Sequence, residues 1–586
     1  MPESGFTPRR RAARRAVAAG VIALAVAASG VACTAEEPPP AEGISSPPVK
    51  GGTLVLLDEA PFYDTLDPQE VYVLNQLNLS TLIYRTLVTM KVAPGAEPEL
   101  TPDLATDLGR PSDDNRTWEF SLRRGLKWED GQEITCEQVR HGVARSFDAR
   151  NGAEAVVQGG PTYPRQVLDV DEDYTGPYTQ PDADFGAVEC ADDWTVRFHL
   201  KHAVGDFPYM LTLPVFSPVR PLGVEKESAF DRSPLANGPY KIVEGKAPDP
   251  DNGQPGRLIL GRNAYWDATT DPARPAYPDR IEVRYGIDRE AATQRMLAGD
   301  REYDNAVFLG SNVPANFIQQ VLADPALYAQ ALTGYTNSVR YLAINTAKVD
   351  DLSCRQALVY AFDRRKFLSV YGGTVFGDYA STMISPQSPA YREFDVYRAK
   401  DNPDGDLERA RELWTEECPD RLTLDHADTP QLKRAAQTIV DTYGKLGIKV
   451  KANPIPADEY FPTIQQTGKQ GDLTLAAWVA DWPNGSGTIP TLYHGDSIVD
   501  GSNLNLAQLN VTEINTLIDQ ASQEPDLAEQ YSLWGELDER IAREAPTVPI
   551  SWGKAVQLMG RNVRGAVMHP QFGMAGVSAL GVATVA

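Results

Sequence analysis

Cysteine, histidine and methionine are scarce in this chain of 586 residues. It contains five cysteines, six histidines and eight methionines. The histidines are scattered, and no two cysteines have the Cys-x-x-Cys spacing of most structural zinc sites. The sequence therefore argues against a zinc centre, and we expect neither a metal nor another cofactor.

Motifs of catalytic sites are also missing. The chain has no Gly-x-Ser-x-Gly, no His-Glu-x-x-His and no glycine-rich loop of the phosphate-cradling type. Pairs of carboxylates are common only because the chain is acidic, so they do not mark an active site. We expect a protein that binds a ligand and is not an enzyme. A secreted hydrolase and a surface adhesin or sensor are the alternatives from other classes.

Positive charge is in short supply, since 55 lysines and arginines face 80 acidic residues, for a net charge of −25. Nucleic acids require a basic surface, so this balance excludes nucleic acid as a partner. At 42% hydrophobic and 23% charged residues, the composition is otherwise that of an ordinary globular protein. The length indicates two or more compact units.

The N-terminus has the pattern of an export signal. Five arginines precede the uncharged run Ala16–Ala32, and Cys33 follows directly. Small residues before a cysteine resemble the lipobox of bacterial lipoproteins, so we expect residues 1–32 to be a signal peptide and Cys33 to be acylated. A plain secretory signal or an uncleaved anchor is the alternative, and Arg14-Arg15 leaves the twin-arginine route open.

A tether is expected next. Residues 34–50 contain five prolines and no aromatic residue, so residues 33–50 are read as an acylated cysteine with a flexible linker. Removing residues 1–32 takes away five arginines and one glutamate, which leaves a net charge of −29. In an exported protein, the four cysteines beyond Cys33 predict two disulfides.

From Gly51 onward, short strand patterns alternate with helical ones, which predicts α/β domains. Residues 117–122 and 194–201 alternate apolar and polar side chains, as half-buried strands do. Residues 432–446 have apolar side chains at helical spacing, and Gly447 then ends the helix before a strand. Two more amphipathic helices are expected around residues 514–521 and 533–541.

An ordered set of motifs resembles the extracellular solute-binding proteins of the peptide and nickel importers, the oligopeptide- and dipeptide-binding protein family. The most specific is Thr117-Trp-Glu-Phe-Ser-Leu-Arg-Arg-Gly-Leu-Lys-Trp-Glu-Asp-Gly131. The others follow in the family's order: Asn237-Gly-Pro-Tyr240, Leu260-Gly-Arg-Asn-Ala-Tyr-Trp266, Leu297-Ala-Gly-Asp300, Tyr341-Leu-Ala-Ile-Asn345, Arg355-Gln-Ala-Leu-Val-Tyr-Ala-Phe-Asp363 and Ala545-Pro-Thr-Val-Pro549. The resemblance covers nearly the whole chain after Gly51.

The resemblance implies an α/β fold of two lobes, a periplasmic-binding-protein clamshell of the large type, with an extra subdomain inserted in lobe 1. The chain is expected to cross between lobes near Tyr341 and to return near Pro549, and the lobes to close on ligand by a hinge motion. The expected ranges are 51–95, 196–338 and 549–586 for lobe 1, 96–195 for the inserted subdomain and 339–548 for lobe 2.

These units also suggest a disulfide pairing. Joining Cys136 with Cys190 and Cys354 with Cys418 keeps each bridge inside one folding unit, so we expect this pairing among the three that four cysteines allow.

The segment from Ala477 to Gly485 is the main candidate for ligand contact. Trp478 and Trp482 flank Asp481 just before a turn, which makes flat walls beside one charge. In peptide-binding members of the family the matching aspartate pairs with the ligand's α-amino group. The alternative is that Asp481 caps the turn and the tryptophans are core residues.

Three further residues are candidates for the ligand site. Tyr72 and Leu74 lie in a segment that resembles the one running along the ligand in peptide binders, and Trp552 follows the expected return at Pro549. An ordinary buried tryptophan is the alternative for Trp552.

The expected function is capture of a small ligand, most simply a short peptide, by a monomeric receptor that hands it to the permease subunits of an ABC importer. The lipid anchor would hold it on the outer face of the cytoplasmic membrane. A nickel complex, an oligosaccharide, an opine or haem is the alternative ligand within the same class.

Overall fold

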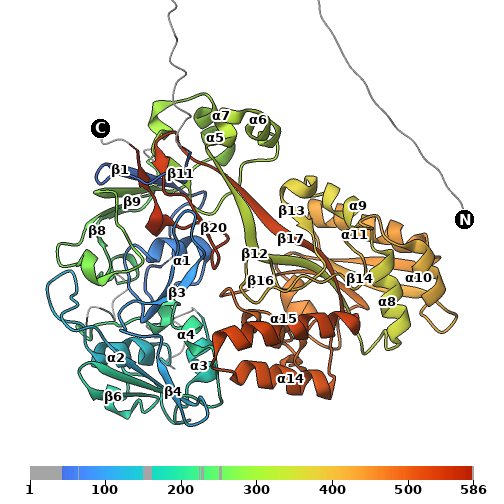
Figure 1. Ribbon diagram of the computed structural model, residues 1–586, viewed down its shortest axis with the longest axis horizontal. Helices are drawn as coiled ribbons and strands as arrows, with labels where there is room; N and C mark the ends of the chain where they lie inside the picture. Colours follow the sequence, from blue (N-terminus) through green and yellow to red (C-terminus); the bar gives the residue numbers. More distant parts are fainter. Residues whose placement is uncertain are drawn as a thin grey trace, which may run out of the picture. The chain divides into compact units, whose positions relative to one another are not determined.

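The computed structural model describes residues 43–63, 65–148, 157, 161–223, 225, 230–249 and 254–583. The expected signal peptide, Cys33 and most of the expected tether lie outside these ranges. Among the described residues, no helix has the length and apolar character needed to cross a membrane. Figure 1 shows the arrangement of helices and strands.

Lobe 1 is built on a five-stranded sheet of order β11-β1-β10-β9-β8. The interior strand β1 (Thr53–Leu57) runs parallel to its neighbours β10 (Arg280–Arg284) and β11 (Ala306–Phe308), and its Leu54, Leu56 and Leu57 are fully buried. Such a continuous apolar run suits a strand covered on both faces. The remaining elements are β8 (Tyr240–Lys246), β9 (Arg257–Arg262), α1 (Leu74–Ser80), α5 (Arg289–Leu297), α6 (Ile318–Ala323) and α7 (Pro325–Tyr328).

A four-stranded antiparallel sheet of order β4-β5-β7-β6 forms the inserted subdomain. Its strands are β4 (Arg110–Ser112), β5 (Thr117–Ser121), β6 (Val188–Asp192) and β7 (Thr195–His199), and its helices are α2 (Cys136–Arg145), α3 (Tyr163–Val167) and α4 (Phe207–Met210). A short hairpin of β2 (Val88–Lys91) and β3 (Glu99–Pro102) precedes it.

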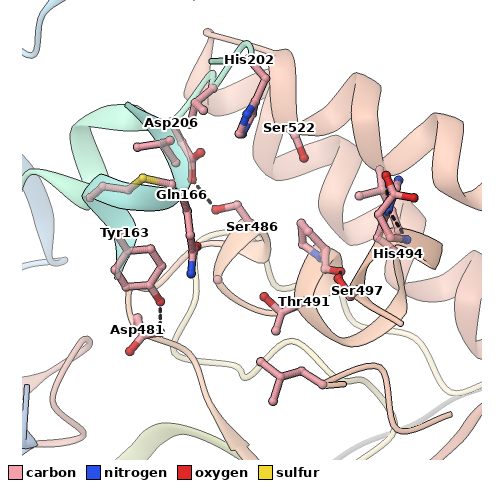
Figure 2. A pocket seen from close by; sticks show the side chains of 18 of the residues that line it. Tyr163, Gln166, His202, Asp206, Asp481, Ser486, Thr491, His494, Ser497 and Ser522 are labelled. Carbon is pink, nitrogen blue, oxygen red and sulfur yellow. Dashed lines mark hydrogen bonds and ion pairs between the residues drawn. The ribbon is translucent and has the colours of Figure 1, made fainter. Parts of the chain in front are cut away.

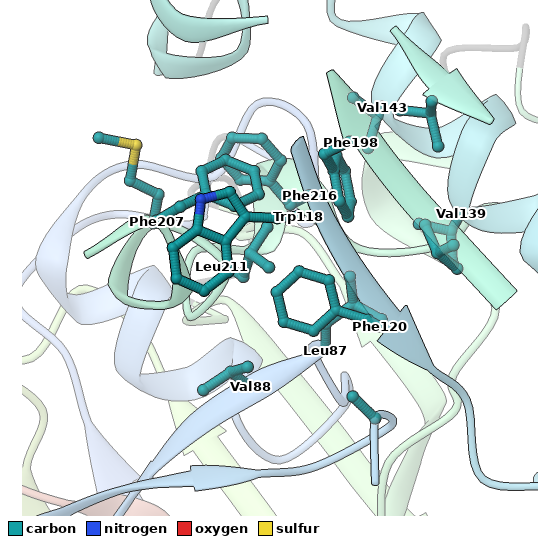
Figure 3. Packing of buried hydrophobic residues seen from close by; sticks show 14 of the residues in the cluster. Leu87, Val88, Trp118, Phe120, Val139, Val143, Phe198, Phe207, Leu211 and Phe216 are labelled. Carbon is teal, nitrogen blue, oxygen red and sulfur yellow. The ribbon is translucent and has the colours of Figure 1, made fainter. Parts of the chain in front are cut away.

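Alternation along β5 and β7 creates the core of this subdomain. Trp118 and Phe120 of β5 are opposite Phe198 and Val196 of β7, and all four belong to one apolar cluster. Figure 3 shows Trp118, Phe120 and Phe198 in this cluster. The rings of Phe120 and Phe198 meet edge to face with centroids 5.9 Å apart. Both predicted strands are confirmed, and because β7 pairs with β5 and β6, the sheet continues past the expected boundary at residue 195 to His199.

Lobe 2 contains a six-stranded sheet of order β13-β17-β12-β16-β14-β15. Its strands are β12 (Ala331–Ile344), β13 (Gly377–Tyr379), β14 (Arg421–Ala427), β15 (Lys449–Ile455), β16 (Leu473–Val479) and β17 (Thr547–Leu558). Its helices are α8 (Leu352–Ala361), α9 (Arg364–Ser369), α10 (Leu407–Leu413), α11 (Pro430–Gly444), α12 (Tyr460–Ile464), α13 (Ile489–Tyr493), α14 (Thr512–Gln523) and α15 (Leu527–Arg543).

The two faces of this sheet pack against different helices. Along β12, Leu342 and Ile344 join the cluster that holds α8 and α11, whereas Tyr341 and Ala343 join the cluster that holds α14 and α15. This is the period-two alternation of a central strand. The layers are visible around the labels α8, α11, α14 and α15 in Figure 1.

The helix, stop and strand predicted around residues 432–450 are confirmed. Thr429 caps the start of α11 by accepting the Leu432 N–H, and Pro430 occupies the first turn, where its missing N–H costs nothing. Gly447 has a φ of 83°, in the left-handed region that glycine enters without strain. The strand β15 then starts at Lys449.

Two long paired strands, β12 and β17, connect the lobes. Leu332 and Ala555 belong to the core of lobe 1, whereas Val339 and Trp552 belong to a core of lobe 2. Their pairing is irregular between Tyr335 and Val339. The passage between lobes therefore lies before Val339 and after Trp552, and the pair expected to mark it, Tyr341 opposite Pro549, lies inside the sheet of lobe 2. The other expected boundaries stay a prediction.

Two disulfides join Cys136 with Cys190 and Cys354 with Cys418, at Cα separations of 5.7 and 5.6 Å. The first connects α2 to β6 in the subdomain, and the second connects α8 to the segment after α10 in lobe 2. This is the pairing that the sequence predicted.

Candidate ligand-binding cavity

A cavity of about 880 Å³ lies between the inserted subdomain and lobe 2 (Figure 2). The subdomain contributes α3 and the segment 202–210, and lobe 2 contributes the segment 478–504 and one face of α14. Tyr72, which precedes α1, also lines it. This volume is within the range of sites that bury a small ligand.

The loop that carries Asp481 is fixed at both ends. At its start, Ala480 exchanges two hydrogen bonds with Asn337 of β12, of 3.1 and 3.0 Å. Beyond it, a Cβ on Gly485 would lie 2.3 Å from Cβ of Trp534, so only glycine fits against α15 there. The Asp481 carbonyl also accepts a hydrogen bond of 3.0 Å from Nε2 of Gln571. The Asp481 side chain therefore projects from a held backbone.

The Asp481 carboxylate connects its loop in lobe 2 to two distant parts of the chain. Its Oδ1 accepts a hydrogen bond of 2.8 Å from the Tyr72 hydroxyl, and its Oδ2 accepts one from the Tyr163 hydroxyl. Both partners are neutral, and no ion pair joins Asp481 to any lysine or arginine in the part of the chain that the structure describes. Burial raises the pKa of Asp481, and the two tyrosine hydrogen bonds oppose this shift only in part.

The same arrangement raises the pKa of both tyrosines. Desolvation is the main cause, and the negative charge of Asp481 adds to it. Tyr72 and Tyr163 therefore remain protonated donors across the physiological pH range. Asp481 accepts no N–H from the backbone of any residue that the structure describes, and the cap of the following turn is Asn484, whose Oδ1 accepts the Gly485 N–H. The geometry does not support the capping role for Asp481.

The two tryptophans beside Asp481 both line the cavity. Trp482 is 3% exposed, its Nε1 donates to Oγ of Ser486 at 2.9 Å, and its ring meets Tyr163 edge to face at 5.2 Å. Nε1 of Trp478 donates to the Gly487 carbonyl at 2.8 Å. Trp482 also belongs to the buried apolar cluster of the subdomain and Trp478 packs against a core of lobe 2, so each tryptophan is both a core residue and part of the lining.

Two candidate residues lie elsewhere. Trp552 is 2% exposed in the core of lobe 2, where its Nε1 donates to the Thr382 carbonyl at 3.1 Å, so it does not line the cavity. Leu74 begins α1 and packs against a separate small cluster that includes Leu77 and Phe572. Neither side chain is among the residues that line the cavity, because a strand or helix sends neighbouring side chains to different faces, and sequence proximity to Tyr72 or Pro549 does not choose the face.

Two of the residues that line the cavity are not marked by any sequence motif. Tyr163 comes from α3, far along the chain from Asp481. Asp206 is 2% exposed, and its Oδ2 accepts hydrogen bonds from Nδ2 of Asn484, at 2.9 Å, and from Oγ of Ser486. Burial raises the pKa of Asp206 as well. Neither residue lies in a motif, and only the folded chain brings them to Asp481 and Ser486.

The subdomain and lobe 2 also touch directly beside the cavity. The Gly205 N–H donates to the Ser522 carbonyl at 2.7 Å, and Nδ2 of Asn115 donates to the Gln523 carbonyl at 2.6 Å. The hydroxyls of Tyr209 and Tyr531 are 2.5 Å apart. Together with the Asp481 and Asp206 contacts, these bonds hold the two sides of the cavity against each other.

Two lobes joined by a pair of long strands, with a cavity where the second lobe meets the insertion in the first, define the class of solute-binding proteins. Residues 99–499 match the family described as bacterial extracellular solute-binding proteins, family 5 Middle. The chain belongs to this family.

Individual relatives agree with this assignment. Heme-binding protein A of Haemophilus influenzae is 25% identical over 516 residues, which cover 84% of this chain and 85% of that protein. Dipeptide-binding protein DppE of Bacillus subtilis is 22% identical over 493 residues, or 81% and 83% of the two chains. Among solved structures, clavulanic acid biosynthesis oligopeptide binding protein 2 has a TM-score of 0.82 at 30% identity and covers 92% of this chain and 98% of its own.

Proposed function

We propose that this protein captures a short peptide in the cavity and that Asp481 pairs with the peptide's α-amino group. The observation that carries the proposal is the state of Asp481: a largely buried carboxylate that contacts two neutral hydroxyls and no cation among the described residues. Trp478, Trp482 and Tyr72 provide walls beside it.

A buried carboxylate without a cation is unfavourable, because desolvation penalises its charged form. A ligand ammonium placed beside it restores the lost interaction. Each carboxylate oxygen can accept about two hydrogen bonds, so the two tyrosine hydroxyls leave acceptor sites free for an amine. Closure of the lobes excludes water from the pair and strengthens the attraction.

The names of two relatives support a peptide ligand, since one is a dipeptide-binding and the other an oligopeptide-binding protein. In this proposal the loaded receptor delivers its peptide to the permease of an ABC importer without chemical change. Cys33 carries the lipid that holds it at the outer face of the cytoplasmic membrane, residues 34–50 act as the tether, and the receptor works as a monomer.

Calorimetric titration tests the role of Asp481. Native mass spectrometry of protein purified without denaturation first identifies the retained ligand, and recovery of that peptide unchanged after incubation separates a receptor from a hydrolase. Asp481→Asn keeps the shape and removes the charge, and it should weaken binding by roughly 2 to 5 kcal/mol. The matched control is Asp420→Asn, which removes the same charge from a side chain that is 83% exposed and outside the cavity. Equal affinities of wild type and Asp481→Asn would remove Asp481 from the site.

A further inference from the structure

Among the described residues, the lysines, arginines and carboxylates that line the cavity are all of one sign. This part of the lining includes four aspartates, Asp206, Asp481, Asp496 and Asp519, and no lysine or arginine. A peptide has a carboxylate as well as an amine, and this lining offers that carboxylate no basic side chain.

The two histidines of the lining do not supply the missing cation. Nδ1 of His494 accepts a hydrogen bond of 3.0 Å from the Asp496 N–H, and its Nε2 lies 3.4 Å from Oδ1 of Asp519, so both ring nitrogens already face groups of the protein itself. His202 is partly buried next to Lys201, and both effects lower its pKa, so it is neutral near pH 7.

The four carboxylates differ in burial, and this difference decides how strongly each one attracts a positive charge on the ligand. The side chains of Asp496 and Asp519 are 97% and 60% exposed, so water and salt screen their charge. Asp206 is 2% exposed, and its hydrogen-bond donors Asn484 and Ser486 are neutral. Like Asp481, Asp206 is therefore a buried carboxylate with neutral hydrogen-bond donors, and it lies on the other side of the cavity.

Figure 2 places these groups. Asp481 lies beside Tyr163, Asp206 lies beside Ser486, and His494 is on the far side of the cavity. The two buried carboxylates are therefore separate sites and not a pair that shares one proton, because each has its own set of donors.

We propose that the cavity selects a peptide with a second positive charge, an arginine or lysine side chain, and that Asp206 is the residue that favours this charge. This inference rests on the proposed function, in which the peptide's α-amino group pairs with Asp481. One ammonium compensates one buried carboxylate and leaves the other unpaired, whereas a basic side chain compensates both. The same lining disfavours a second carboxylate on the ligand.

Matched peptides test the selection. Ala-Arg-Ala and Ala-citrulline-Ala have nearly the same shape, and only the first has a charged side chain. Titration of the full mature protein at near-physiological salt should show the arginine peptide binding about tenfold or more tightly. Amidation of the C-terminus should leave the affinity of Ala-Arg-Ala unchanged or raise it. Equal affinity of the arginine and citrulline peptides would overturn the proposal while leaving peptide binding intact, and failure of every peptide to bind would overturn the proposed function with it.

Two variants assign the effect to Asp206. Asp206→Asn keeps an oxygen that can accept from Ser486, and it should reduce the ratio of the two affinities while binding of the citrulline peptide persists. Asp420→Asn changes the net charge equally outside the cavity and should leave the ratio unchanged. A ratio that stays the same in Asp206→Asn would remove Asp206 from the proposal, and the wild-type comparison tests the selection even where that variant folds poorly.

Discussion

The hydroxyl of Tyr72 donates a hydrogen bond of 2.8 Å to Oδ1 of Asp481, although 409 positions separate the two residues in the chain. The bond joins a segment of lobe 1 to a loop of lobe 2, and Tyr163 of the inserted subdomain completes the junction from the other oxygen. The carboxylate proposed to bind the ligand thus also helps to hold the cavity closed.

Removing both hydroxyls should loosen the closed arrangement. Each hydrogen bond to a charged group contributes about 1.5 to 3 kcal/mol when buried, and less for Tyr72, which is 44% exposed. The double variant Tyr72→Phe/Tyr163→Phe should therefore show a larger radius of gyration without ligand, measured by small-angle X-ray scattering. Tyr328→Phe, an exposed tyrosine outside the junction, serves as the control. An unchanged radius in the double variant would show that the other contacts beside the cavity suffice for closure.

Ligand affinity should decrease as the pH falls, because protonation of Asp481 removes the charge that pairs with the ligand. Burial raises the pKa of this carboxyl in the free protein, and an ammonium partner lowers it in the complex, so binding releases a proton at pH values between the two. Affinity is therefore fully present above the raised pKa of the free protein and is lost as the pH falls through it. Titration from about pH 7.5 to about pH 4.5 should show this loss in wild type and a flatter profile in Asp481→Asn. Parallel profiles in the two proteins would place the titrating group elsewhere.

Asp538 should make the folded protein less stable at higher pH. It is 2% exposed on α15, it accepts the N–H groups of Met383 and Ile384, and burial raises its pKa to about 7. Below the ordinary pKa of 3.8 both states are protonated and there is no penalty. Between that value and 7 the unfolded state loses its proton first, so stability decreases as the pH rises, and above 7 the penalty is constant.

The variant Asp538→Asn isolates this contribution, because it keeps an acceptor oxygen and cannot ionise. Relative to the variant, wild type should lose roughly 2 to 3 kcal/mol of unfolding free energy between about pH 5 and about pH 8, measured by urea denaturation. A constant difference between the two proteins over this interval would contradict the raised pKa.

The disulfide of the inserted subdomain should contribute substantially to stability. It closes a loop with a sequence separation of 54, and the chain-entropy account assigns about 4 kcal/mol to a loop of that length. Replacing Cys136 and Cys190 by serine should therefore lower the unfolding free energy by about 2 to 5 kcal/mol. The same pair of changes at Cys354 and Cys418, with a separation of 64, gives the comparison in lobe 2. A loss below about 1 kcal/mol in both would show that the sheets alone hold these units.

The sequence alone determined the local elements and the family. Alternation of side chains predicted β5 and β7, and helical spacing that ends at a glycine predicted α11 and β15. These features depend on neighbouring residues, and binary pattern and turn chemistry encode them directly. The ordered motifs identified the solute-binding class, and the aromatic residues around Asp481 pointed to the cavity before any geometry was known.

The tertiary structure decided what meets Asp481. Tyr163 and Asp206 lie in segments with no motif, and Trp552, which sequence proximity favoured, turns into the core instead. Such contacts join positions hundreds of residues apart, and they depend on how two lobes and an inserted subdomain are packed together. A local pattern does not encode that packing. The burial of two carboxylates with no cation partner among the described residues, and with it the inferred preference for a basic ligand, follows only from the folded chain.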